Sequence, residues 1–216
     1  NPPETDIGFF GIQNPKPTLV DFDSDGDLDL LVGTAQGLFY FEFDVAKDVF
    51  ETKAGTVNDL VYEETPLSNP FGALSLGMLH NDMLTTNALD PFAHAYIAFA
   101  DMDSDGDLDA FVTSKDRVTY LNNTGTRSVP VFEYVPNYFQ WGEDCTYCTV
   151  ALGDVNKDGK TDVVIGTGAI SNGDSNALKL LYFENKGTAN VAQFNAKPED
   201  ESSNPFSVIN AATATT

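Results

Sequence analysis

A nine-residue acidic pattern, D-x-[DN]-x-D-G-x-x-D, occurs three times in this chain of 216 residues. The copies cover residues 21–29, 101–109 and 154–162, and we name them loop 1, loop 2 and loop 3. Each copy ends where a short run of branched apolar side chains begins, which is typical of a buried strand. A single acidic turn containing glycine is usually a solvated surface turn. Three copies in phase with strands instead predict a repeated β structure built around these loops.

Alternating oxygen ligands in a tight loop suit a hard cation such as Ca²⁺, which binds roughly six to eight oxygens. We therefore predict about three calcium ions, one in each loop. The predicted ligands are the side chains at positions one, three, five and nine and the backbone carbonyl at position seven, and the glycine at position six permits the sharp turn. These ligand residues are Asp21, Asp23, Asp25, Asp27 and Asp29 in loop 1, Asp101, Asp103, Asp105, Asp107 and Asp109 in loop 2, and Asp154, Asn156, Asp158, Lys160 and Asp162 in loop 3.

The residues that follow each loop distinguish between families of calcium loops. An EF-hand places a glutamate at position twelve and continues into an amphipathic helix. Position twelve is here Val32, Val112 or Ile165, each inside a strand-like run. The EF-hand and dockerin interpretations are therefore excluded.

A loop that ends at position nine and enters a strand resembles the FG-GAP or VCBS repeat, the blade unit of integrin α-subunit-type β-propellers. The resemblance extends beyond the loops. An aromatic run follows the next turn, at residues 38–41, 118–121 and 180–183, and two copies continue into an Asn-x-Gly-Thr turn, at residues 123–126 and 185–188. The resemblance implies an all-β fold with about three propeller-type blades.

The chain is predicted to be one repeat domain, residues 1–216, with blade-like repeats at 18–65, 95–140 and 148–197. Propellers typically contain roughly four to eight blades. Three blades therefore imply incomplete closure within one chain. The long interval between loop 1 and loop 2 indicates an insertion between residues 54 and 91.

Residues 198–216 are interpreted as the start of a further blade or as a strand donated to another copy. An Asn-Pro-Phe triplet occurs at 69–71 and again at 204–206. The interval from the first triplet to loop 2 is similar to the interval from the second triplet to loop 1 if the two termini are joined. The Ala- and Thr-rich end, residues 211–216, is expected to be a linker or an edge strand.

Composition limits the partners of the protein. The formal net charge is −22, which argues against nucleic acid and anionic membranes, since both bind basic surfaces. The sequence contains no run of about 18 apolar residues, so membrane insertion is not expected. We expect a secreted or cell-surface protein, because calcium and disulfide bonds belong to that compartment.

Two smaller motifs support an extracellular location. Cys145 and Cys148 form a C-x-x-C pair, which is predicted to be a short structural disulfide, with free thiols, zinc binding or redox chemistry as the alternatives. Asn122 begins an N-x-[ST] sequon in the turn after an aromatic strand and is a candidate glycosylation site.

These observations favour an extracellular calcium-binding β-repeat protein with a structural or adhesive role and no enzyme activity. Calcium-bound aspartates are not available for acid–base catalysis, and His80 and His94 are more simply explained as surface or packed side chains. The expected partners are other copies of the chain, assembled head to tail into a filament, or an extracellular protein or glycan.

A lectin-like module that binds glycans or proteins is the alternative function. Its sugar-stacking side chains would come from five aromatic residues outside the loops, which could equally pack in the core between blades. These residues are Phe92, Tyr96, Tyr138, Phe139 and Trp141.

Overall fold

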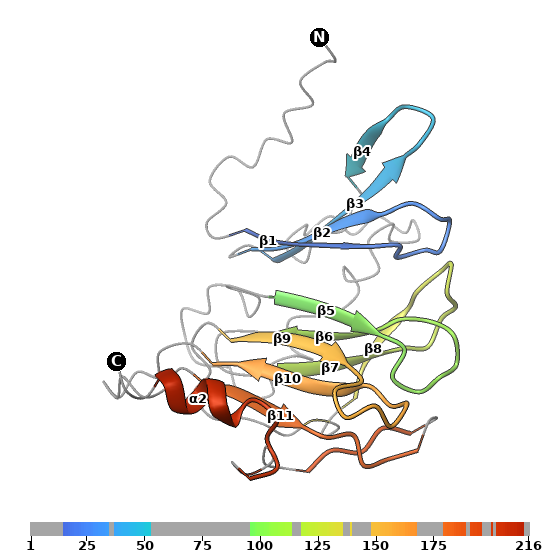
Figure 1. Ribbon diagram of the computed structural model, residues 1–216. Helices are drawn as coiled ribbons and strands as arrows, with labels where there is room; N and C mark the ends of the chain where they lie inside the picture. Colours follow the sequence, from blue (N-terminus) through green and yellow to red (C-terminus); the bar gives the residue numbers. More distant parts are fainter. Residues whose placement is uncertain are drawn as a thin grey trace, which may run out of the picture.

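The structure, a computed structural model, describes residues 15–34, 37–52, 96–113, 118–135, 139, 148–167, 179–188, 191–195, 200 and 202–213. Within these residues, strands form three antiparallel sheets, and one short helix lies near the C-terminus (Figure 1). The elements are β1 (Lys16–Val20), β2 (Asp29–Thr34), β3 (Gly37–Asp44), β4 (Val49–Thr52), β5 (Tyr96–Ala100), β6 (Asp109–Thr113), β7 (Val118–Asn123), β8 (Phe132–Tyr134), β9 (Thr149–Gly153), β10 (Asp162–Gly166), β11 (Leu180–Phe183) and α2 (Ser207–Thr213).

Each sheet is a meander in which strands that follow one another in sequence are neighbours. The first sheet has the order β1-β2-β3-β4, the second β5-β6-β7-β8 and the third β9-β10-β11. The expected fold class is confirmed: the structure is nearly all-β, its sheets resemble incompletely closed propeller blades, and the described strands form no closed barrel.

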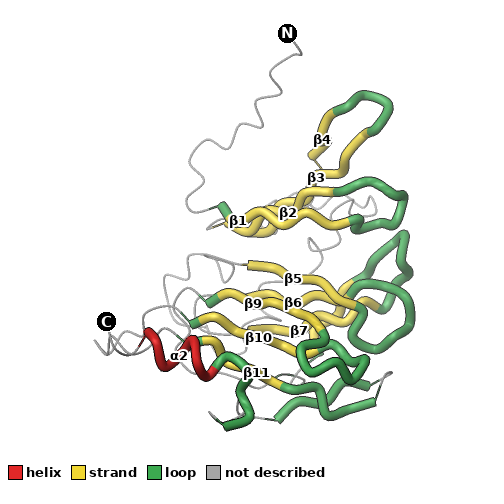
Figure 2. Tube along the Cα trace, in the orientation of Figure 1, coloured by secondary structure: helices red, strands yellow, loops and turns green. Residues whose placement is uncertain are grey.

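The acidic loop joins the first strand of each sheet to the second. The apolar runs after the loops form β2, β6 and β10, and the aromatic runs form β3, β7 and β11, as the sequence predicts. Antiparallel pairing brings the last residue of the first strand opposite the ninth loop residue, as in the pair Ala100 and Asp109. Figure 2 shows the three loops at the same end of the sheets.

The second sheet is packed on both faces, and every residue of β6 is buried. One core joins it to the first sheet through side chains that include Phe22, Leu31 and Leu121. The other core joins it to the third sheet through side chains that include Phe111 and Val163. Strand β1 contacts β5, and β5 contacts β9, so the first strands of the three sheets lie side by side, as the inner strands of neighbouring propeller blades do.

The C-terminal segment differs from the expected linker or edge strand, because Ser207–Thr213 form helix α2. The Asn204 side-chain oxygen accepts a hydrogen bond from the Phe206 N–H at 2.8 Å, as residues at helix N-termini commonly do. Pro205 suits the first turn of a helix, where its missing N–H is not needed. The Asn-Pro pair is therefore a helix-start signal that the strand interpretation did not take into account.

Helix α2 covers part of the free edge of the third sheet. The Asn210 amide accepts a hydrogen bond from the Leu180 N–H (2.8 Å) and donates one to the Leu180 carbonyl (3.0 Å). The Phe206 ring also packs edge-on against Tyr182, with ring centroids 6.5 Å apart. A strand added at this edge would form hydrogen bonds with backbone N–H and carbonyl groups of β11. At Leu180 the Asn210 side-chain amide already makes both of these hydrogen bonds.

Candidate metal centres in the acidic loops

The three loops share one backbone conformation. Position four has a left-handed φ in each loop, at Ser24 (62°), Ser104 (60°) and Lys157 (64°). Position six is glycine with φ of 102°, 98° and 84° in loops 1, 2 and 3, a region that side chains disfavour. Side-chain oxygens of earlier loop residues accept backbone N–H groups of later ones, such as Asp105 Oδ1 from the Asp107 N–H at 3.1 Å. The repeated pattern therefore encodes a repeated loop.

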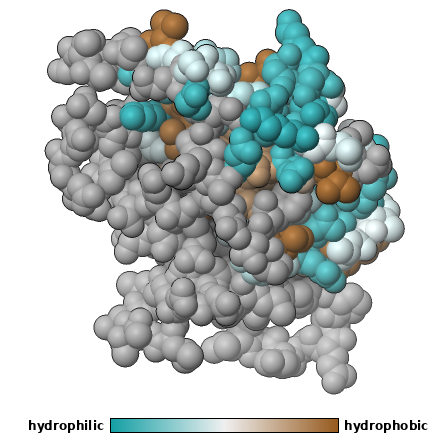
Figure 3. All heavy atoms as spheres, turned by 90° about the horizontal axis from the view of Figure 1, so that it is seen from below, coloured by the Kyte–Doolittle hydropathy of each residue, from teal (hydrophilic) through white to brown (hydrophobic). Residues whose placement is uncertain are grey.

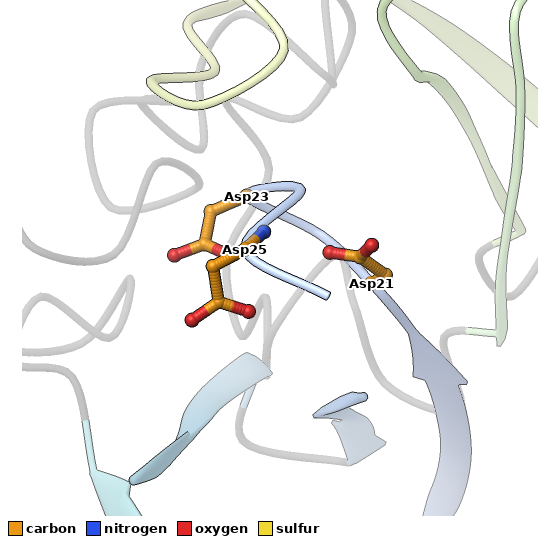
Figure 4. Close-up of side chains that lie close together, drawn as sticks. All are labelled: Asp21, Asp23 and Asp25. Carbon is orange, nitrogen blue, oxygen red and sulfur yellow. The ribbon is translucent and has the colours of Figure 1, made fainter. Parts of the chain in front are cut away.

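Loops 1 and 2 each gather three carboxylates around one point. One oxygen from each of Asp21, Asp23 and Asp25 lies within 4.8 Å of the others, and the same holds for Asp101, Asp103 and Asp105. Figure 4 shows Asp21, at the end of β1, facing Asp23 and Asp25 across the turn. Like charges at this spacing repel, which is consistent with pKa values of Asp23 and Asp103 that are raised, first by burial and then by the neighbouring aspartates.

Four carboxylate oxygens in these two loops are buried without a hydrogen-bond partner. They are the Oδ1 atoms of Asp21, Asp27, Asp101 and Asp107. Asp107 is the most enclosed, with 7% of its surface exposed. Burial, followed by the charge of Asp105, raises the pKa of its carboxyl group to about 6. An unpaired buried carboxylate is costly, so the Asp107 side chain is a candidate cation ligand in loop 2.

The side chain at position seven is thus a candidate ligand that sequence reasoning missed. The sequence prediction gave Asp27 and Asp107 only a carbonyl role. The sequence offered one signal for this role: position seven is an aspartate in loops 1 and 2 but a lysine in loop 3.

The aspartate at position nine has a second role, because it fastens the loop to the sheet. Asp109 is 1% exposed, and its two oxygens accept hydrogen bonds from the backbone N–H groups of Met102 (3.0 Å) and Asn123 (2.8 Å). Met102 lies in the loop, and Asn123 lies at the end of β7. The carboxylate therefore bridges the loop and the third strand of its sheet.

The equivalent aspartates make the same bridge in the other two sheets. Asp29 accepts the Phe22 and Phe43 N–H groups, and Asp162 accepts the Val155 and Asn185 N–H groups. A tyrosine hydroxyl from the aromatic strand adds a further hydrogen bond, from Tyr40 at 3.3 Å and from Tyr182 at 2.9 Å. Neither Asp29 nor Asp109 belongs to the three-carboxylate groups of the described residues, and metal binding by position nine stays a prediction.

Loop 3 differs from loops 1 and 2 because a lysine side chain places a positive charge among its predicted ligands. The Lys160 ammonium lies 3.0 Å from Asp158 Oδ2 and donates a hydrogen bond to the Gly187 carbonyl at 3.3 Å. The hydrogen bond from Lys160 is the main reason that the pKa of Asp158 is lowered. The remaining predicted ligands, Asp154 and Asn156, accept loop N–H groups. The described residues of loop 3 form no three-carboxylate group.

Loop 1 also contacts the second sheet. The Arg127 side chain, in the turn between β7 and β8, donates from Nε to the Ser24 hydroxyl of loop 1. Nearby, the Thr18 hydroxyl donates to the Ile97 carbonyl at 3.0 Å and joins β1 to β5. The conformation of loop 1 is therefore coupled to the packing of the first sheet on the second.

The remaining predicted sites are only partly described. Cys148 is buried, but Cys145 lies outside the described residues, and the disulfide stays a prediction. Asn122 is half-buried in β7, where its side-chain oxygen accepts a hydrogen bond from Tyr120 at 2.8 Å, and its glycosylation is untested. The insertion at 54–91 lies outside the described residues, as do His80 and His94.

Of the five aromatic residues named for the lectin-like alternative, Phe139 is buried in the core. Phe139 is 9% exposed and packs edge-on against Phe183, with ring centroids 4.8 Å apart. This ring belongs to the core between the second and third sheets. Tyr96 packs at the border of the same core, whereas Phe92, Tyr138 and Trp141 lie outside the described residues.

The described surface is predominantly polar on the face shown in Figure 3, with a few separate hydrophobic patches. No helix among the described residues has the length and apolar character needed to cross a membrane.

Antiparallel meanders with an acidic loop between their first and second strands define a β-repeat module. Residues 101–165, from loop 2 to β10, match the family model of the FG-GAP-like repeat. The match confirms, for this segment, the FG-GAP-like repeat expected from the sequence, and a repeat of this kind suggests a β-repeat module of an adhesive or binding type. No curated protein and no solved structure is significantly similar to the chain.

Proposed function

We propose that this protein is an extracellular β-repeat module with an adhesive or binding role, held in shape by calcium in its acidic loops. The observation that carries the proposal is the pairing of a three-carboxylate group with buried, unpartnered carboxylate oxygens in both loop 1 and loop 2. Oxygen-only ligand sets of this kind are what Ca²⁺ binds. The FG-GAP-like repeat supports the extracellular setting, because such repeats are typical of extracellular proteins.

In loop 2 the ion would be held by the carboxylates of Asp101, Asp103 and Asp105, with Asp107 completing the set. Bound calcium would supply positive charge that neutralises these carboxylates and links the residues of the loop. The chain itself fixes the end of the loop, because Asp109 binds the backbone of β7. The role is therefore structural, and we propose that the protein is not an enzyme.

Thermal unfolding in chelator and in calcium tests this function. If the dissociation constant is about 10⁻³ M, as in other extracellular modules, then 10 mM calcium stabilises the protein by about 1.4 kcal/mol for each occupied loop. Two loops should raise the melting temperature by roughly 5–10 °C. Equal melting temperatures in chelator and in calcium would refute the proposal.

A pair of matched variants assigns the effect to the loops. Asp103→Asn removes one charge from the carboxylate group of loop 2 and should remove a substantial part of the calcium-dependent shift. Asp48→Asn removes one charge from the exposed turn between β3 and β4, which also has a left-handed φ of 58°, and should leave the shift unchanged.

We also propose that the partner is a second copy of the chain or an extracellular protein or glycan. Exposed apolar side chains at the two ends of the described chain support a head-to-tail contact: Val208 and Ile209 on α2 are 80% and 52% exposed, and Leu19 on β1 is 58% exposed. A contact between two different surfaces of this kind forms rings or filaments. Because α2 is helical, the contact would use its surface and no donated strand.

Sedimentation of the Val208→Asp, Ile209→Asp double variant tests the assembly. It should shift an oligomer to monomer, whereas Val45→Asp, at a similarly exposed site (67%) in the β3–β4 turn, should not. A wild-type protein that stays monomeric at high concentration would contradict self-assembly and leave the protein or glycan partner.

A further inference from the structure

The three loops have the same backbone but very different charge. Loops 1 and 2 each contain five aspartates and no basic residue, whereas loop 3 contains three aspartates and two lysines. The hydrogen bond from the glycine at position six to the aspartate at position one is present in loop 2 (Gly106 to Asp101, 3.2 Å) and in loop 3 (Gly159 to Asp154, 2.9 Å). The difference between the loops is therefore in the charged side chains and not in the fold of the loop.

The charge difference between the loops is clearest at position seven. Asp27 and Asp107 occupy it in loops 1 and 2, and each has a buried oxygen without a hydrogen-bond partner. Lys160 occupies it in loop 3, with its ammonium 3.0 Å from Asp158 Oδ2. Where two loops have an excess of carboxylate oxygen, the third has an internal positive charge.

The ammonium also fastens loop 3 to its own sheet. Besides Asp158, Lys160 Nζ binds the Gly187 carbonyl at 3.3 Å, in the turn that follows β11. Lys160 is mostly enclosed, with 22% of its side chain exposed. Across the described residues 154–162, no buried side-chain oxygen is left without a hydrogen-bond partner.

We propose that Lys160 takes the place of a divalent cation in loop 3, so that loops 1 and 2 depend on calcium and loop 3 does not. This inference rests on the proposed calcium function of loops 1 and 2. It changes the sequence expectation of about three ions to two. A divalent ion approaching Asp158 would meet the ammonium of Lys160, and repulsion between the like charges lowers the affinity of loop 3.

The glycine at position six gives one reporter amide for each loop. Gly26, Gly106 and Gly159 all lie inside the loops, so their amide resonances in a ¹H–¹⁵N spectrum should respond to an ion bound in the same loop. Titration of the whole chain with Ca²⁺ should move the Gly26 and Gly106 signals to saturation at millimolar concentration. The Gly159 signal should stay in place over the same range.

Two variants of loop 3 test the role of the lysine. Lys160→Asp recreates the position-seven carboxylate of the other loops, and calcium should then move the Gly159 signal as well. Lys160→Gln removes only the charge and should strengthen calcium binding to loop 3 by roughly tenfold or more. Lys157→Ser is the matched control, because it removes an exposed lysine and introduces the residue found at Ser24 and Ser104; it should leave Gly159 unresponsive.

The outcomes separate this inference from the proposed function. If calcium moves all three glycine signals with similar affinity in the wild-type chain, the inference is wrong and the calcium function stands. The inference is also wrong if neither Lys160 variant makes Gly159 responsive. If no glycine signal moves, the calcium function itself fails, and the inference fails with it.

Discussion

Replacement of Asp109 by alanine should separate the structural role of position nine from the metal-binding role of the other positions. Asp109 is almost fully buried, and it accepts hydrogen bonds from the Met102 and Asn123 N–H groups at 3.0 and 2.8 Å. Asp109→Ala leaves both N–H groups buried without an acceptor. At about 1–3 kcal/mol for each unsatisfied group, the variant should lose roughly 4 kcal/mol of unfolding free energy at pH 7, with or without calcium.

Asp105→Ala is the matched comparison in the same loop. The Asp105 side chain is exposed, and its Oδ1 accepts a hydrogen bond from the Asp107 N–H at 3.1 Å. In excess chelator its loss should cost less than about 1 kcal/mol, because removing one charge also relieves repulsion within the group. Calcium should then stabilise Asp105→Ala less than it stabilises the wild type.

Urea unfolding of the two variants and the wild type, in excess chelator and in 10 mM calcium, measures all of these quantities. The expected result is a large loss for Asp109→Ala in both conditions and a loss for Asp105→Ala mainly in calcium. Equal losses for the two variants in chelator would refute the bridging role of Asp109.

Three further predictions follow from the turns, the buried carboxylates and the cysteines. Gly187→Ala should destabilise the protein by about 1–3 kcal/mol, because a Cβ at Gly187 would lie 2.0 Å from the Val191 carbonyl oxygen, whereas Gly153→Ala, with no atom within 4 Å, should have little effect in the same urea assay. Burial raises the pKa of Asp109 from 3.8 to about 6, so the folded calcium-free protein binds this proton more tightly than the unfolded chain does, and its stability should fall as the pH rises from about 4 to about 6; a rise in chelator over this range would contradict this. Mass spectrometry of the unreduced chain should find Cys145 joined to Cys148, and alkylation without prior reduction would count against that disulfide.

The repeated strands could be predicted from the sequence because their signals are local. The apolar run after loop 2 and the aromatic run at 118–121 have the composition of strands, and both form strands in the structure. The FG-GAP-like repeat could be recognised for the same reason, since its loop and the strand after it are contiguous. The hydrogen bonds of position nine could not be predicted, because the Asp109 carboxylate and the Asn123 N–H that donates to it come together only when β6 pairs with β7.

The C-terminal helix and the lysine of loop 3 show two different limits of prediction from the sequence. Residues 211–216 were expected to be a linker or an edge strand, because alternating threonines suit a strand. The local Asn204 cap could have been read from the sequence, whereas the bonds from Asn204 and Asn210 to Leu180 depend on the finished third sheet. Lys160 was visible in the sequence as a basic residue in an acidic pattern. Its contact with the Gly187 carbonyl, which lies 27 residues away in sequence, could not be seen without the structure.

The central claim is that the carboxylate groups of loops 1 and 2 hold calcium, and diffraction from crystals grown in calcium tests it most directly. Anomalous difference maps should show one peak in each of these loops, roughly 2.3–2.6 Å from the carboxylate oxygens of Asp21, Asp23 and Asp25 in loop 1 and of Asp101, Asp103 and Asp105 in loop 2. Maps with ordered carboxylates but no anomalous peak in either loop, at calcium concentrations well above 1 mM, would contradict the claim.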